Sequence, residues 1–261
     1  MTIKNTLAFM APLATSVLGH GTAPYFRTDG KVNTGFLSSY YWDDQAGNPY
    51  PDTAGWYSAN PNNEYIAPSA YGSSDINCHF NSRPGKATAS IPAGGVIDFL
   101  WTPWPHIGPV FTYIAKCSGD CANADKNSLS WVKIDEEGID IPTQKWAATK
   151  LIENNNTWTT TVPENLAPGN YVFRNEIIGV HSAGEPNGAQ NYPQCFNIEV
   201  TGSGTVQLPA GTPGTQLYRA NDPGILFNPY GHVDSYEIPG PKLWTGASAS
   251  AKDRRHPREF S

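Results

Sequence analysis

Charged residues are scarce in this chain. They make up 15% of its 261 residues, and 17 lysines and arginines against 23 acidic residues give a formal net charge of −6. Nucleic acids and anionic membrane surfaces attract proteins through basic patches, which this acidic balance does not supply. We therefore expect no nucleic-acid partner and no membrane partner.

Long hydrophobic runs are also missing. The most apolar stretch, residues 7–18, is shorter than the roughly 20 apolar residues of a transmembrane helix. One lysine precedes it and small residues follow as far as Gly19, which is the plan of a secretory signal peptide. We expect residues 1–19 to be a signal peptide, the protein to be secreted, and the mature chain to begin at His20. Cleavage after Ala14 would instead leave His20 an ordinary surface residue.

Cysteine is rare, and the four cysteines are Cys78, Cys117, Cys121 and Cys195. An even number in a secreted chain predicts two disulfides, for which three pairings can be drawn. The short polar stretch around Cys117 and Cys121 favours a local bridge, which would leave Cys78 to pair with Cys195. The C-x3-C spacing could also suit zinc, but no second cysteine–histidine pair accompanies it.

Glycine (25), proline (23) and aromatic residues (12%) are abundant. This composition favours many short strands joined by long loops. We predict an all-β fold, an antiparallel immunoglobulin- or fibronectin-like β-sandwich with long loops and a few short helices. β-Branched and aromatic content predicts strands near residues 32–41, 95–101, 110–115, 129–134, 157–162, 171–180 and 195–201, and a short helix within 143–152.

The sandwich should occupy residues 20–244 as one domain. Residues 245–261 are polar and are expected to form a disordered tail, with no carbohydrate-binding module. Asn155-Asn156-Thr157 is a glycosylation sequon, which predicts a glycan on Asn155 in an exposed loop.

Two of the six histidines occur in distinctive settings. His106 lies in a loop between two expected strands that prolines and a glycine stiffen, and His181 ends a strong strand. Gln190 and Tyr192 are two residues apart near the start of another strand, so both side chains point to one face. By contrast, we expect surface or locally bonded side chains at His79, His232 and His256.

These residues belong to longer motifs that cover most of the mature chain. The motifs are His20-Gly21, His106-x-Gly108-Pro109-Val110, Glu176-Ile177-Ile178 with His181-Ser182-Ala183, Gly188-Ala189-Gln190-x-Tyr192-Pro193-Gln194-Cys195, and Asp222-Pro223-Gly224-Ile225. In this order they resemble the fungal copper-dependent lytic polysaccharide monooxygenases of auxiliary activity family 9. That resemblance implies a secreted enzyme that cleaves β-1,4-glucosidic bonds of cellulose or related glucans by oxidation.

The resemblance also implies a site. The amine and Nδ1 of His20 and Nε2 of His106 would hold one copper ion, with Tyr192 at a distant axial position. His181 and Gln190 would hydrogen-bond the oxygen species, and the disulfides would be Cys78–Cys195 and Cys117–Cys121. Three nitrogen ligands suit Cu(II), and a metal can displace the proton of an α-amine whose pKa is roughly 7.7–8.

Two departures from the family pattern stand out. His106 directly follows Trp104-Pro105, so its loop is about two residues shorter than is usual in the family. Asn175 also stands where the family often has histidine, and we expect no effect of this on copper.

The resemblance further implies a flat face that lies on a glucan. Tyr230 matches a surface tyrosine of the family, and Tyr25 and Tyr40 are further candidates for stacking on sugar rings. The expected partners are cellulose or another β-glucan and an external electron donor, either a small reductant or cellobiose dehydrogenase. O2 or H2O2 would be the co-substrate, and the protein would be a monomer.

Two other readings compete with this one. A hydrolytic glycosidase would need two carboxylates, and Asp43/Asp44 and Glu136/Glu137 are the adjacent pairs. A non-catalytic copper- or carbohydrate-binding protein could share the scaffold. Oxidised products that depend on a reductant would distinguish the monooxygenase from both.

Overall fold

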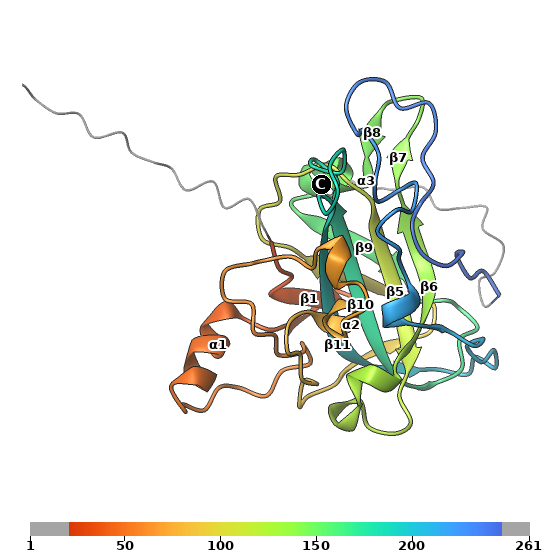
Figure 1. Ribbon diagram of the computed structural model, residues 1–261. Helices are drawn as coiled ribbons and strands as arrows, with labels where there is room; N and C mark the ends of the chain where they lie inside the picture. Colours follow the sequence, from red (N-terminus) through yellow and green to blue (C-terminus); the bar gives the residue numbers. More distant parts are fainter. Residues whose placement is uncertain (1–20, 247–261) are drawn as a thin grey trace, which may run out of the picture.

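The computed structural model describes residues 21–246. The predicted signal peptide, His20, His256 and nearly all of the predicted tail lie outside these residues. Two sheets form the body of the protein, and long loops connect them (Figure 1).

The smaller sheet has four strands in the order β2-β1-β4-β9. Their bounds are Lys31–Thr34, Tyr25–Thr28, Val96–Leu100 and Thr157–Thr161. The larger sheet has six strands in the order β12-β6-β5-β10-β11-β3. Their bounds are Thr212–Pro213, Ser130–Glu137, Val110–Lys116, Gly169–Gly179, Gln190–Thr201 and Ala89–Pro92.

Short elements complete the fold. A two-stranded ribbon pairs β7 (Ile139–Asp140) with β8 (Lys145–Trp146). The helices are α1 (Ser38–Gln45), α2 (Asp75–Cys78) and α3 (Ala147–Glu153). Single 3₁₀ turns lie at Pro68–Ala70, Cys121–Asn123, Lys126–Ser128 and Gly214–Gln216.

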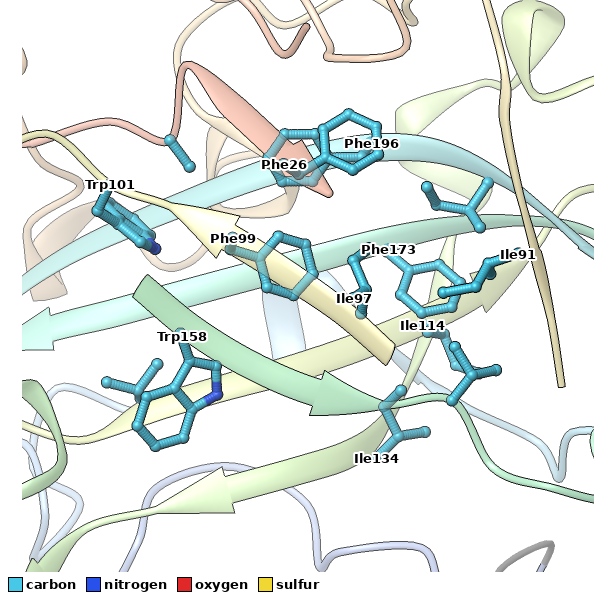
Figure 2. Packing of buried hydrophobic residues seen from close by; sticks show 14 of the residues in the cluster. Phe26, Ile91, Ile97, Phe99, Trp101, Ile114, Ile134, Trp158, Phe173 and Phe196 are labelled. Atoms are coloured by element: carbon cyan, nitrogen blue, oxygen red, sulfur yellow. The ribbon is translucent and has the colours of Figure 1, made fainter. Parts of the chain in front are cut away.

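A hydrophobic core fills the space between the two sheets. Figure 2 shows Phe99 of β4 beside Phe173 of β10 in this layer, with Trp158 of β9 further along it. Phe196 lies 4.8 Å from Phe26 and 5.4 Å from Phe99 between ring centroids, so aromatic contacts join the sheets. The predicted β-sandwich is confirmed, with one parallel pair, β3 with β11, among its antiparallel ladders.

A second core covers the outer face of the larger sheet. Trp131 and Tyr113 on the strands pack there with Trp56, Ile66 and Tyr71 from the long loops. The central strands β5 and β10 are therefore buried on both faces, and their residues do not alternate between buried and exposed.

Most predicted elements occur near their expected places. The expectation of one strand over residues 32–41 is wrong, because β2 ends at Thr34 and α1 begins at Ser38. The aromatic residues of this segment favoured a strand, because such residues pack well on a half-buried sheet. Helix α1 buries no residue, so the segment has no sheet to pack against and does not need to be extended. Strands β1 and β3 were not predicted.

Both disulfides of the resemblance are present in the structure. Cys78–Cys195 ties α2 to β11, and Cys117–Cys121 closes a short loop after β5. In the chain-entropy model, a bridge that spans 117 residues contributes about 4–5 kcal/mol to stability.

Three strands of the larger sheet bring their ends together at one edge of the sandwich. Gly179, at the end of β10, pairs with Gln190 at the start of β11. Val110, at the start of β5, pairs with Ile177 of β10. This edge is where the predicted site residues are expected to meet. No helix within residues 21–246 is long and apolar enough to cross a membrane.

Candidate metal centre

The loop that carries His106 is fastened to the end of β10. Val180 donates its backbone N–H to Ile107 at 3.0 Å, and Ile178 donates to Pro109 at 3.2 Å. Gly108 lies between them with φ +154°, and a Cβ there would be 1.8 Å from the carbonyl oxygen of Ile178. The sequence therefore needs glycine at this contact, and the contact brings the His106 loop beside the segment that leads to His181.

His106 and His181 stack on one another. Their ring centroids are 3.7 Å apart and their planes differ by 14°. Both residues are half-buried, although Nδ1 of His181 is itself buried. Two imidazoles from segments 75 residues apart in the chain thus share one small region at the edge of the sheets.

Trp104 links this pair to the rest of the site. Its ring lies edge-on to His106 at 5.7 Å and edge-on to Tyr192 at 4.8 Å. Its Nε1 donates to the carbonyl of His106 at 2.8 Å, which fixes the turn before the histidine. Gly21 also packs here, since a Cβ on it would lie 3.0 Å from the Trp104 ring. The residue that directly follows His20 is therefore against the tryptophan that touches both His106 and Tyr192.

Tyr192 and Gln190 point to the same side of β11, as predicted. The Tyr192 hydroxyl donates to Oε1 of Gln190 at 2.8 Å. Burial raises the pKa of Tyr192 well above its ordinary value, with a smaller contribution from Tyr65, so the phenol stays protonated. A Cβ on Gly179 would lie 3.4 Å from His181 and 3.7 Å from Gln190, which places the last two side by side.

The donor types suit copper. Two imidazoles and a neutral phenol are present, and imidazole nitrogens with a weaker oxygen donor suit Cu(II). Within residues 21–246, no three histidine, cysteine, aspartate or glutamate side chains lie close enough to hold a metal ion. Completion of a site at His106 would therefore need a ligand from outside this range, and His20 is next to Gly21.

The three predicted substrate tyrosines lie in two places. Tyr230 is 64% exposed, and its hydroxyl donates to the carbonyl of His181 at 2.8 Å. Tyr25 is exposed on β1, and Tyr40 on α1 stacks on Tyr50 at 5.4 Å. Burial raises the pKa of Tyr40, with smaller contributions from Tyr25 and Asp43.

Three of the four adjacent carboxylates considered for a hydrolase are engaged elsewhere. Glu136 pairs with Lys133 at 2.7 Å, and Glu137 pairs with Lys150. Asp44 accepts from Arg83 at 2.8 Å, and this hydrogen bond is the main reason that its pKa is lowered. A lowered pKa is the opposite of what a proton-donating acid needs.

Other predicted residues lie where their surroundings explain them. Asn155 is exposed in a turn at φ +52°. Asn175 is fully buried, accepts from the Trp101 indole at 2.8 Å and donates to Phe111 at 3.0 Å. Asn175 therefore has a structural role in the core between the sheets. His79 is buried beside Cys78, and His232 is exposed, 3.6 Å from Asp234.

Sequence reasoning missed two contributors. Asn156 Oδ1 accepts from the backbone N–H of Trp104 at 2.9 Å, so the turn after α3 supports the His106 loop. Trp42 is 59% exposed on α1 and adds a large aromatic surface. Trp42 directly follows the expected strand over residues 32–41 and was not singled out, whereas Asn156 was considered only as part of the sequon.

Comparison with known proteins agrees with this geometry. The family model described as Auxiliary Activity family 9, formerly GH61, matches residues 20–236. The chain is 52% identical over 243 residues to the lytic polysaccharide monooxygenase cel61B of Hypocrea jecorina, which covers 92% of this chain and 98% of that protein. It is 52% identical over 235 residues to monooxygenase D of Botryotinia fuckeliana, covering 90% and 95%.

Solved structures agree as well. The structure of Cel61B from Hypocrea jecorina superposes with a TM-score of 0.85 and 51% identity, covering 86% of this chain and all of that one. The extended catalytic domain of LPMO9A from H. jecorina gives a TM-score of 0.82 at 44% identity, covering 90% and 95%. The chain therefore belongs to auxiliary activity family 9, the lytic polysaccharide monooxygenases, which are copper-dependent enzymes that cleave polysaccharides by oxidation.

Proposed function

We propose that this enzyme cleaves β-1,4-glucosidic bonds of cellulose or a related β-glucan, taking electrons from an external donor and using O2 or H2O2 as co-substrate. Family membership supports the oxidative chemistry. A relative from M. thermophila, described as a cellulose-active polysaccharide monooxygenase, is 29% identical with a TM-score of 0.73 over 86% of this chain, which supports the choice of glucan.

We propose that copper would be held by the amine and Nδ1 of His20 and by Nε2 of His106, with the phenol of Tyr192 as a weaker ligand. The stacked histidine pair beside Trp104 and Tyr192 is the observation that carries this assignment. Gly21 packs on the same tryptophan, which supports a ligand from the preceding residue. Copper, when bound, would supply the one-electron chemistry that activates the co-substrate for attack on a C–H bond.

The protein's own groups would then control protons and orientation. The His181 ring lies face to face with the ligand ring of His106, so it can donate or accept a proton next to the reacting centre. Gln190 Oε1 accepts a hydrogen bond from the Tyr192 hydroxyl. Because Oε1 is engaged in this way, Nε2 is the end of the amide that can donate a hydrogen bond within the site. Burial raises the pKa of Tyr192, so its phenol would be offered to copper as a neutral, weak ligand.

Tyr230 is the strongest candidate for contact with sugar rings. It is exposed and its hydroxyl is tied to the backbone of His181, so its ring is held next to the proposed reaction centre. We propose Tyr25, Tyr40 and the exposed Trp42 as a second group of aromatic contacts on the β1–α1 side. Planar rings can stack on the apolar faces of glucose units while hydroxyl groups bond to polar ones.

We further propose that residues 1–19 direct secretion, that residues 20–244 form the catalytic domain, and that residues 245–261 are a disordered tail. Asn155 is the proposed glycosylation site because it is exposed in a turn within its sequon. The protein would act as a monomer, with a small reductant or cellobiose dehydrogenase as its electron donor.

Product analysis tests the proposed function. The copper-loaded enzyme, incubated with phosphoric-acid-swollen cellulose and ascorbate, is expected to release oligosaccharides with oxidised ends, and His106→Ala should release none. Simple reducing ends without need for a reductant would favour hydrolysis. Tight copper binding without oxidised products from any β-glucan would favour a non-catalytic binding protein.

A further inference from the structure

Asn191 lies between the two β11 residues proposed to act at the copper site. Because side chains alternate along a strand, Gln190 and Tyr192 face the core between the sheets, while Asn191 faces the outer core with Tyr71. Asn191 is fully buried. Its side chain therefore cannot touch copper or substrate, and any effect on the site must act through its neighbours.

The start of β11 needs support beyond its own ladder. Strand β3 pairs with β11 only from Ile198 to Thr201, so residues 190–194 have a neighbouring strand, β10, on one side only. Pro193 follows Tyr192 directly and has no N–H to donate. The segment that carries Gln190 and Tyr192 is thus the least supported part of this strand.

Asn191 supplies the missing support on its free side. Its backbone N–H donates to Ile66 at 3.1 Å, and its carbonyl accepts from Ile66 at 2.9 Å. Its Oδ1 accepts from the Tyr71 hydroxyl at 2.7 Å, and its Nδ2 donates to Oε1 of Glu176 at 2.8 Å. All hydrogen-bonding groups of this residue are used to hold the strand.

The anchor on the far side of Asn191 is a buried ion pair. Arg174 Nη1 donates to Oε2 of Glu176 at 2.7 Å, and both side chains are fully buried. Arg174 is fixed in turn by the carbonyls of Asn77 and Ile76 at 2.8 and 2.9 Å. A hydrogen bond to a carboxylate that is fixed in this way is stronger and more directional than one between neutral groups.

We propose that Asn191 is a positioning residue, which transmits the rigidity of the Arg174–Glu176 pair to Tyr192 and Gln190 and thereby sets the geometry of the copper site. The measurements on the copper-loaded protein described below rest on the proposed function, whereas the copper-free crystal structures do not. No step of the reaction is assigned to Asn191 itself.

The strand offers a matched control in Asn197. Asn197 is also fully buried, accepts from the Trp56 indole at 2.7 Å and donates to the Gly85 carbonyl at 2.6 Å. It lies on the same face of β11 as Asn191, but about 17 Å from Tyr192 at 3.3–3.4 Å per residue. Asn191→Leu and Asn197→Leu should therefore lower the melting temperature similarly, while only the first should disturb the site.

The experiment has a structural and a spectroscopic arm. Crystal structures of the copper-free variants should show the Tyr192–Trp104 contact, 4.8 Å between centroids here, displaced in Asn191→Leu and kept in Asn197→Leu. With copper, the electron paramagnetic resonance spectrum should change in Asn191→Leu alone, and turnover should fall about 10–100-fold, as for other supporting residues of metal sites. Tyr71→Phe, which removes one hydrogen bond and little volume, should shift the spectrum in the same direction by less.

An unmoved Tyr192–Trp104 contact in Asn191→Leu would overturn the proposal, and so would an equal displacement in Asn197→Leu. If Asn191→Leu fails to fold, Tyr71→Phe decides between the same outcomes. Absence of a copper signal in the unmodified protein would instead count against the proposed function, and the copper-free structures would still decide the role of Asn191.

Discussion

Two groups of histidines in this protein differ in how the fold holds their imidazoles: the isolated His79, and the pair His106 and His181 at the proposed copper site. His79 is 1% exposed, its Nδ1 accepts from the N–H of Phe80 at 3.0 Å, and the amide of Asn60 lies 3.2 Å from its Nε2. Burial lowers its pKa to about 4, so it is neutral at ordinary pH. Partners within 20 residues of the chain satisfy this ring.

His106 and His181 differ from His79 in the origin of their partners. They come from separate segments of the chain and stack ring on ring, with Trp104 edge-on to His106 and Gly179 next to His181. Burial alone does not distinguish the two groups, because Nδ1 of His181 is also buried. What sets the two histidines of the proposed copper site apart is that distant segments converge on one point.

The largest expected effect comes from removal of a proposed ligand. His106→Ala should weaken copper binding by more than about 100-fold and abolish oxidation, because it removes a proposed direct ligand. Loss of a residue that only supports a ligand already lowers metal affinity or activity about 10–100-fold. Isothermal titration with Cu(II) measures this. Unchanged copper affinity would remove His106 from the ligand set.

Replacement of the stacked partner should separate binding from turnover. His181→Ala should retain copper within a few fold but lose about 100-fold or more in turnover, the range typical for loss of a positioned proton donor or acceptor. Release of oxidised oligosaccharide, measured beside a copper titration, checks both halves. Full turnover in this variant would exclude His181 from the mechanism.

Acidification should affect His79, the buried histidine that lies outside the proposed copper site. The pKa of His79 is about 4 when folded and 6.5 ordinarily, so the unfolded chain binds a proton first as the pH falls. Its contribution is complete above pH 6.5 and lost towards pH 4, on the order of 3 kcal/mol. Urea unfolding of the copper-free protein across this range, compared with His79→Leu, isolates the contribution; equal pH dependence in both proteins would refute it.

The same variant sharpens the comparison at neutral pH. His79→Leu leaves the buried N–H of Phe80 without its acceptor, which should cost about 1–3 kcal/mol of unfolding free energy. Copper affinity should stay at the value of the unmodified protein. Thermal unfolding and copper titration measure the two quantities, and loss of copper binding in a folded His79→Leu protein would contradict the distinction drawn here.

The smallest expected effect concerns Tyr230. Tyr230→Phe keeps the ring but removes its hydrogen bond to His181, which is exposed and should contribute only about 0.5–1.5 kcal/mol. Adsorption to cellulose should therefore weaken a few fold, and Tyr230→Ala should weaken it more. Binding isotherms for the two variants provide the check, and equal adsorption of all three proteins would exclude a contact role.

Much of the larger sheet could be predicted because its central strands are rich in β-branched and aromatic residues. The strand predicted over residues 171–180 matches β10 (Gly169–Gly179) to within one residue at its end, and residues 195–201 lie within β11. The motifs around His106 and Gln190 likewise predicted residues that the fold does bring together. The residue pattern therefore predicted strands correctly where they are buried on both faces.

The failures are confined to segments whose structure depends on distant contacts. Helix α1 contains no buried residue. The backbones of Gly35 and Gly55, before and after this helix, pack so closely that a Cβ on Gly55 would lie within 2.5 Å of Gly35. Asn191 depends on Tyr71 and Glu176, which only the folded chain places beside it. Such side-chain clamps leave no periodic signal, so sequence reasoning could not find them.

The N-terminus of the secreted protein provides the most direct test of the central claim, that cleavage before His20 creates the copper site. Copper affinity should be measured for protein shown by mass spectrometry to begin at His20 and for protein with one glycine added before it. We expect tight binding of one copper ion by the first and a loss of at least about 100-fold in the second, whose imidazole is intact but whose amine is displaced. Equal affinity of the two proteins would contradict the account.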